Sequence, residues 1–306
     1  MFYNLLLPLA DEFIIFNLFR YITFRTGGAI ITAFIICLFI GPKVIRWLKS
    51  RQKGGQPIRE DGPESHLAKT GTPTMGGVMI LISGGISILL WADLTNRFVW
   101  IVAATIIGYG LIGFWDDFAK LTSRSHKGIS GKLRLSLECI VALGAVMALL
   151  PLFPEGQGTG LAIPFLKDFL LPLGVLFIPF AVLVIVGSAN AVNLTDGLDG
   201  LAIVPVIIAA ACFGVISYIV GRVDFTNYLQ LYYIEGVGEL AILCGALIGA
   251  GMGFLWYNAP PAAVFMGDTG SLSMGAGLGV IAVAIKHEIV LAIIGGLFVL
   301  ETISVI

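Results

Sequence analysis

The stretch Asn190-Ala-Val-Asn-Leu-Thr-Asp-Gly-Leu-Asp-Gly200 lies between two long apolar runs, 170–186 and 201–220. Its polar residues recur at intervals of three, which places them along one face of an α-helix or a 3₁₀ turn. These residues are Asn190, Asn193, Asp196 and Asp199. Two carboxylates and two amides form an oxygen-rich wall that suits a hard cation or a polyhydroxy ligand, although the spacing is not that of an EF-hand loop. A simple connecting loop is the alternative, because Asn, Asp and Gly also favour turns.

The composition indicates a membrane protein. Of the 306 residues, 58% are hydrophobic and only 12% are charged, whereas soluble domains carry about 25% charged residues. The net charge of −1 gives no indication of a nucleic-acid partner. The four cysteines lie in apolar runs without metal-type spacing, so we interpret them as small core residues. We therefore expect an all-α, polytopic bundle that forms a single transmembrane domain over residues 1–306.

Nine apolar runs are long enough to be candidate membrane spans, for which about 20 apolar residues are needed. Glycines inside them are typical of close helix–helix packing. A segment rich in proline and glycine, 151–169, is expected to be a loop near the membrane interface. The nine predicted spans cover residues 23–47, 76–92, 98–115, 131–150, 170–187, 200–220, 239–257, 271–285 and 289–306.

The distribution of lysine and arginine predicts the orientation of the bundle. The links after the first and third spans carry 12 of the 18 basic residues, and basic links face the cytoplasm. Arg20 and Arg25, before or at the start of the first span, oppose this placement but are outnumbered. We therefore expect a periplasmic N-terminus and cytoplasmic links after spans one, three, five and seven. On the outer links, we expect Glu235 and Glu239 to be solvated or to cap helices.

The unusual polar motifs all fall on the four predicted cytoplasmic links. The first motif occupies residues 59–77 and includes Lys69 and Thr74. The second combines Asp116 and Asp117 with Lys120 and, further on, Lys127 and Lys132. The third and fourth motifs occupy residues 190–200 and 258–271. This distribution predicts one polar pocket at the inner surface.

Asp116 and Asp117 lie at the predicted inner end of the third span. A carboxylate at the centre of a membrane helix costs about 2.5–3.5 kcal/mol, and adjacent carboxylates also repel each other. A bound cation would offset this cost, and so would Lys120, which lies about one helical turn away. A solvated helix end with an ion pair is the alternative.

Gly267-Asp268-Thr-Gly-Ser271 opens the eighth predicted span. This pattern is typical of an ordinary helix N-cap, but the same helix terminus can also bind an anion. Asp268 is therefore a candidate metal ligand beside N–H groups that can meet a phosphate. Phe265 can stack on a base, although the sequence alone favours packing.

Carboxylates that bind Mg²⁺ and lysines that meet phosphate oxygens are the components of phosphoryl transfer. The chain has no Walker GxxxxGK[ST] motif. An ion-coupled transporter is an alternative, since intramembrane carboxylates also mark ion pathways. The acidic residues lie at the inner ends of spans rather than near mid-span, which argues against a transporter.

Five elements of the sequence resemble the polyprenyl-phosphate N-acetylhexosamine-1-phosphate transferases. They are Asp-Gly-Pro-Glu-Ser-His at 61–66, Gly-Thr-Pro-Thr-Met-Gly-Gly at 71–77, Asp-Asp at 116–117, Asn-Leu-Thr-Asp-Gly-Leu-Asp-Gly-Leu-Ala at 193–202 and Phe-Met-Gly-Asp at 265–268. The resemblance extends from about residue 20 to the end of the chain. The first two elements favour the muramoyl-pentapeptide branch over the GlcNAc-1-phosphate branch, which is the alternative.

The resemblance implies a reaction in a bacterial inner membrane. UDP-N-acetylmuramoyl-pentapeptide would donate its phospho-sugar to undecaprenyl phosphate, giving lipid I and UMP at the cytoplasmic face with Mg²⁺. Dimers occur in the family, so a homodimer is a further expected partner besides the bilayer.

The resemblance also implies roles for individual residues. Asp268 would bind the metal, Asp117 would support metal or phosphate binding, and Asp116 would be the base that readies the lipid phosphate. Direct attack without a base stays open, because a phosphate is already largely ionised near pH 7. Phe265 would stack on uracil. The donor and its phosphates would be bound by Lys69, Thr74, Lys120, Lys132, Asn190, Asn193, Asp196 and Asp199.

The chain departs from the family pattern at its C-terminal end. Family members continue with a loop of consecutive histidines and a tenth span, whereas this sequence stops at Ile306 and has no consecutive histidines. We therefore expect part of the donor site to be missing and the 306-residue chain to have weak activity or none. A scaffold without catalysis is the corresponding alternative.

Overall fold

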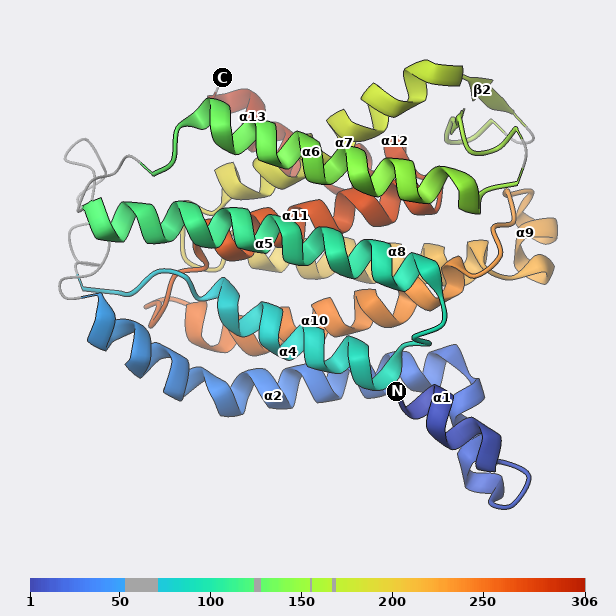
Figure 1. Ribbon diagram of the computed structural model, residues 1–306, viewed down its shortest axis with the longest axis horizontal. Coiled ribbons are helices and arrows are strands. Elements are labelled where there is room, and N and C mark those ends of the chain that lie inside the picture. The colour runs from blue at the N-terminus through green and yellow to red at the C-terminus, as the bar shows by residue number, and fades with distance from the viewer. Residues whose placement is uncertain (53–70, 124–127, 155, 167–168, 306) are drawn as a thin grey trace.

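The computed structural model describes residues 1–52, 71–123, 128–154, 156–166 and 169–305, which form a bundle of long helices (Figure 1). Six of the described helices are long and apolar enough to cross a membrane, and α4 is a shorter apolar helix. The expectation of an all-α, multi-pass bundle is thereby confirmed. The long helices are α2 (Ile22–Arg51), α4 (Gly77–Trp91), α5 (Arg97–Ser123), α6 (Gly131–Leu149), α7 (Phe177–Thr195), α8 (Ile203–Val220), α10 (Leu240–Asn258) and α11 (Gly267–Ala284).

Two predicted spans differ from the helices that form. The fifth was expected over 170–187, but residues 170–172 form strand β2 and α7 extends to Thr195. A positive φ of 54° at Gly174 turns the chain between the strand and the helix. The ninth span divides at Gly295 into α12 (Glu288–Ile294) and α13 (Gly296–Val305).

Short elements gather at the end of the bundle away from the predicted cytoplasmic links (Figure 1). Strand β1 (Gly160–Ala162) pairs antiparallel with β2 (Leu170–Pro172), and Leu161 lies opposite Leu171. This hairpin lies partly within the predicted 151–169 loop. The other short elements are α1 (Phe2–Leu6), η1 (Leu7–Leu9), η2 (Ile14–Arg20), η3 (Leu150–Leu152), η4 (Gly174–Leu176), α9 (Val223–Leu229) and η5 (Val237–Glu239).

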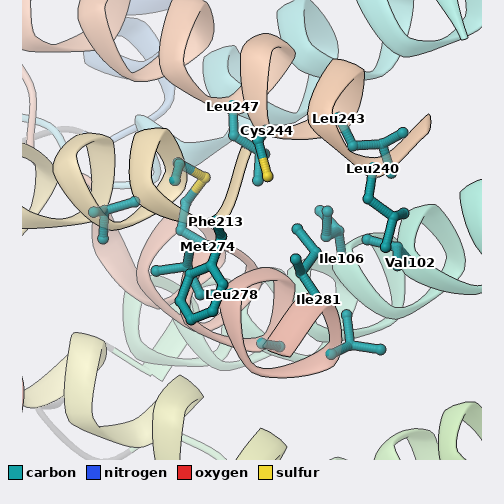
Figure 2. Packing of buried hydrophobic residues seen from close by; sticks show 14 of the residues in the cluster. Val102, Ile106, Phe213, Leu240, Leu243, Cys244, Leu247, Met274, Leu278 and Ile281 are labelled. Atoms are coloured by element: carbon teal, nitrogen blue, oxygen red, sulfur yellow. The ribbon is translucent and has the colours of Figure 1, made fainter. Parts of the chain in front are cut away.

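Helix α11 forms the centre of the bundle, and all its residues from Thr269 to Ala284 are buried. It packs chiefly against α5 and α7, and also against α4 and α8. Figure 2 shows Met274, Leu278 and Ile281 among side chains of α5, α8 and α10. Glycines in α11 allow neighbouring backbones to approach closely, as in other membrane bundles. The position of the N-terminus of α11 is therefore fixed by tertiary packing.

Candidate active site

The N-terminus of α11 carries Asp268, and Asp117 of α5 holds it in place. One carboxylate oxygen of Asp117 accepts the backbone N–H of Asp268 at 3.2 Å, and the other accepts the backbone N–H and the hydroxyl of Thr269 at 3.0 and 2.7 Å. A carboxylate at this position satisfies N–H groups that lack partners within the helix and complements the helix dipole. Asp117 is 1% exposed. It fixes the backbone on which the Asp268 side chain stands.

The backbones around Asp268 lie unusually close together. A Cβ atom at Gly113 of α5 would collide with the carbonyl group of Asp268, so this approach requires glycine. The segment before α4 is tied to the segment before α11, because Gly76 and Gly77 donate to the carbonyl oxygens of Phe265 and Met266 at 2.8 and 2.9 Å. The predicted Thr-Pro-Thr-Met-Gly-Gly and Phe-Met-Gly-Asp elements therefore meet in space.

Two cations share one oxygen atom of Asp268. Lys120 of α5 and Arg134 of α6 contact its Oδ2 at 2.9 and 3.1 Å. Lys120 also contacts Oδ2 of Asp116 at 2.6 Å, and the other oxygen of Asp116 accepts the backbone N–H of Ile129 at 2.9 Å. Lys120 thus bridges Asp116 and Asp268, and Arg134 places a second positive charge beside Asp268.

Helix α7 supplies amides to the same cluster. Asn193 donates to Oδ1 of Asp268 at 2.8 Å and to the hydroxyl of Ser271 at 2.8 Å. Asn190 donates to Glu138 of α6 at 2.5 Å, and its own oxygen accepts from Arg134 at 3.0 Å. The interval of three residues between Asn190 and Asn193 therefore puts both amides on the cluster side of the helix, as predicted.

The remaining predicted residues occupy different places. Thr74 is 2% exposed, and its hydroxyl is a buried polar atom without a hydrogen-bond partner among the described residues. This hydroxyl faces Gly267, where a Cβ would lie only 2.7 Å from it. Lys132 is exposed, and none of its side-chain contacts within the described part of the chain reaches the carboxylates. Lys69 lies outside the described residues.

Asp196 and Asp199 do not continue the helical face of Asn190 and Asn193 as predicted, because α7 ends at Thr195 and both aspartates lie in the turns that follow. Asp196 accepts the backbone N–H of Gly267, and burial raises the pKa of its carboxyl well above the usual range, with the charges of Asp268 and Asp117 adding to the shift. Asp199 accepts the backbone N–H of Ala262 at 3.3 Å, so it anchors the loop that leads to α11. Phe265 in that loop is partly exposed.

The sequence analysis did not single out Arg134 and Glu138 as site residues. Glu138 is fully buried in an apolar helix, and Arg134 lies one turn earlier at an i, i+4 spacing that brings the side chains together. A carboxylate inside a predicted span was therefore an available signal. Lys132 was expected instead of Arg134, but residues two positions apart point to different faces of a helix.

The charges of the cluster do not balance. Among the described residues, four carboxylates (Asp116, Asp117, Glu138, Asp268) lie beside two cations (Lys120, Arg134), an excess of two negative charges when all four are ionised. Asp196 is left out of this count because burial raises the pKa of its carboxyl. One divalent cation would neutralise this excess. Within the described ranges, no three His, Cys, Asp or Glu side chains form a preformed metal cage. Mg²⁺ usually needs only one or two carboxylates, with waters and substrate phosphates completing its shell. The unpartnered hydroxyl of Thr74 lies beside Gly267, which precedes Asp268 in the chain. Carboxylate and hydroxyl oxygens are a donor set that fits Mg²⁺.

Comparison with known proteins places this cluster in a family of enzymes. Residues 99–286 match the model of glycosyl transferase family 4. The chain is 61% identical over 307 residues to the phospho-N-acetylmuramoyl-pentapeptide-transferase of Granulibacter bethesdensis, a match that covers 100% of this chain and 85% of the relative. It is 59% identical over 312 residues to the enzyme of that name from Maricaulis maris, with the same coverage. The chain belongs to the phospho-N-acetylmuramoyl-pentapeptide-transferase family.

Membership in the phospho-N-acetylmuramoyl-pentapeptide-transferase family confirms the resemblance predicted from the motifs. It also confirms that the protein is a transferase and favours the muramoyl-pentapeptide branch over the GlcNAc-1-phosphate branch. The ion-coupled transporter interpretation loses its basis, because the clustered carboxylates belong to an enzyme family.

Proposed function

We propose that this protein transfers phospho-N-acetylmuramoyl-pentapeptide from its UDP conjugate to undecaprenyl phosphate at the cytoplasmic face of a bacterial inner membrane. The observation that carries the proposal is the meeting of residues from separate chain segments around Asp268, in a chain 61% identical to a transferase of that name. A water-soluble donor and a lipid acceptor can react where both have access, at the membrane surface. The cluster lies at the helix ends next to the basic links, which face the cytoplasm by the charge rule.

The proposed reaction exchanges one phosphoanhydride bond for another. An oxygen of the lipid phosphate attacks the phosphorus that carries the sugar. The bond from this phosphorus to the bridging oxygen breaks, and UMP leaves with that oxygen. Asp116, which Lys120 bridges to Asp268, is the proposed acceptor for any proton that the lipid phosphate retains. Lys120 and Arg134 supply positive charge for the phosphate oxygens.

Asp268, supported by Asp116, would hold a Mg²⁺ ion. Such an ion supplies Lewis-acid stabilisation of charge on the phosphate oxygens. Asp117, which was predicted as a second ligand, already accepts from three donors of Asp268 and Thr269. We therefore assign Asp117 a positioning role that fixes Asp268. The nucleotide-sugar is proposed to contact three residues next to Asp268 and Arg134, namely Asn190, Asn193 and Asp196. Phe265, in the loop that leads to α11, is the proposed uracil contact.

The test is release of UMP in detergent from UDP-N-acetylmuramoyl-pentapeptide and undecaprenyl phosphate, with and without Mg²⁺. It uses the 306-residue chain and the same chain extended by the C-terminal segment that the resemblance implies. We expect Mg²⁺-dependent release that falls about 1000-fold or more in Asp268→Ala, since a metal contributes several kcal/mol to such a reaction. Release from UDP-N-acetylglucosamine alone would assign the protein to the sister branch. Failure with both donors in both chains would overturn the proposal.

A further inference from the structure

Arg134, Glu138 and Asn190 form a closed ring of contacts beside Asp268. Nε of Arg134 lies 3.3 Å from one oxygen of Glu138, and the other oxygen of Glu138 accepts from Asn190 at 2.5 Å. The oxygen of Asn190 accepts from Nη2 of Arg134 at 3.0 Å. Each side chain thereby fixes the orientation of the next. The guanidinium group is planar and rigid, so its remaining nitrogen, Nη1, is fixed at 3.1 Å from Oδ2 of Asp268.

Burying the charges of this ring costs more free energy than a purely structural contact would need. Glu138 is fully buried within an apolar helix, and burial of a charge pair usually costs more than an apolar pair of the same volume. Neutralising Glu138 would require only the contact with Nε. The ring instead holds the guanidinium against Asp268, and the Arg134 side chain is 24% exposed although the Glu138 side chain is not exposed at all.

The shared oxygen of Asp268 indicates what Arg134 contacts during the reaction. Lys120 and Arg134 both donate to Oδ2, so a divalent cation bound to Asp268 would have to share this oxygen with them or displace them from it. With a cation bound there, Arg134 would keep Glu138 and Asn190, while its Nη1 donors would face whatever else the cation binds. Guanidinium has five N–H donors. Two of them donate to Asp268 and Asn190, and the Nε group lies 3.3 Å from Glu138 as an ion pair without a hydrogen bond. Within the described part of the chain, one further N–H group remains on each of Nη1 and Nη2. Two parallel N–H groups match the geometry of phosphate oxygens.

We propose that Arg134 binds the diphosphate of the nucleotide-sugar donor beside Asp268, and that Glu138 is the positioning residue that holds Arg134 in place. This inference rests on the proposed function and adds a substrate contact from α6 to those predicted from the sequence. It also explains why Lys132, which is exposed on another face of α6, need not enter the cluster.

The test measures the affinity of UDP and of uridine in the presence of Mg²⁺, in the form of the chain that supports UMP release. Arg134→Gln is expected to weaken UDP binding by about 10- to 100-fold, as for loss of a hydrogen bond between charged groups, and to leave uridine binding unchanged. Glu138→Gln retains an acceptor for Arg134 and should weaken UDP binding less than Glu138→Leu does. Arg222→Gln is the matched control, since Arg222 pairs with Asp224 at the opposite end of the bundle.

A double variant separates substrate binding from charge balance. Arg134→Met with Glu138→Leu removes the buried pair together, so thermal stability should return to at least the wild-type level while UDP binding stays weak. Recovery of UDP affinity in this variant would overturn the inference, and so would unchanged affinity in Arg134→Gln. Wild-type protein that binds neither UDP nor uridine would instead contradict the proposed function itself.

Discussion

The two ends of the bundle each bury ionised side chains, but they arrange them in opposite ways. At the outer end, Arg25 of α2 and Glu239 form a bidentate pair, with nitrogen–oxygen distances of 2.7 and 2.5 Å. Glu239 also accepts the backbone N–H of Asp93, and Arg25 lies 4.3 Å from the ring centre of Tyr3. One cation thus meets one carboxylate, and both carboxylate oxygens are occupied.

The inner end is unbalanced by comparison. Four carboxylates face two cations around Asp268, and both cations compete for a single oxygen. A matched pair can be satisfied within the protein, whereas an excess of buried negative charge is offset only when a cation or protons bind. In this bundle, the ratio of carboxylates to cations, more than their burial, therefore distinguishes a structural charge cluster from a functional one.

The largest effect is expected when the matched pair is broken. Glu239→Gln would leave the charge of Arg25 buried without a carboxylate, which typically costs about 3–5 kcal/mol. The free energy of unfolding, measured by denaturant titration in detergent, should fall by that amount. Arg25→Met combined with Glu239→Leu should recover most of the loss, because the unpaired charge is then gone. A loss below 1 kcal/mol in Glu239→Gln would show that the pair is not structural.

The Arg25–Glu239 pair could not be predicted from the sequence. We expected Glu239 to be solvated or to cap a helix, yet it is 8% exposed and pairs with a residue 214 positions away. Hydropathy predicted both helices, since each contains a long and mainly apolar run. Hydropathy contains no information on which helices become neighbours. Pairing across the bundle depends on tertiary packing.

An intermediate effect is expected from magnesium at the inner end. At a Mg²⁺ concentration of 100 times its dissociation constant, binding should stabilise the wild-type protein by about 2.7 kcal/mol. Mg²⁺ should stabilise Glu239→Gln by the same amount, because the carboxylates around Asp268 are unchanged in that variant. Asp268→Asn should gain none. In EDTA, Asp268→Asn should lose less than 1 kcal/mol, since three carboxylates still face Lys120 and Arg134. Equal stabilisation of Asp268→Asn by Mg²⁺ would place the metal elsewhere.

The candidate site was predictable in its parts but not in its assembly. Asp116, Asp117, Asn190, Asn193 and Asp268 were all singled out from motifs, and the structure brings them together. The motifs did not show that both oxygens of Asp117 accept hydrogen bonds from the N-terminus of α11. They also did not show that the α6 residue in contact with Asp268 is Arg134. Both facts depend on the angle at which helices meet, to which a local sequence pattern is insensitive.

The smallest effect tests whether an unmatched charge is costly at the outer end as well. Lys286 follows α11, is 2% exposed, and donates to the carbonyl oxygen of Gly158, with its Nζ 3.6 Å from the ring centre of Phe177. Burial lowers the pKa of Lys286 to about 8, and the nearby charge of Glu288 opposes the shift. Unlike Arg25, this cation has no carboxylate at salt-bridge distance within the described residues.

The sign of the pH effect follows from proton binding. An unfolded lysine has a pKa of about 10.4, so between pH 8 and 10.4 the unfolded chain binds more protons than the folded one. The stability contributed by Lys286 therefore rises with pH in this window, by about 2 kcal/mol between pH 8 and pH 10. Lys286→Met has no proton to release and should lack this rise when unfolding of both proteins is compared at each pH. Burial lowers the pKa of His287 and raises that of Glu288 to about 7, so both groups titrate below this window. Identical pH slopes for wild type and Lys286→Met would mean that the fold tolerates this unmatched cation without cost, and charge stoichiometry would then matter at the inner end alone.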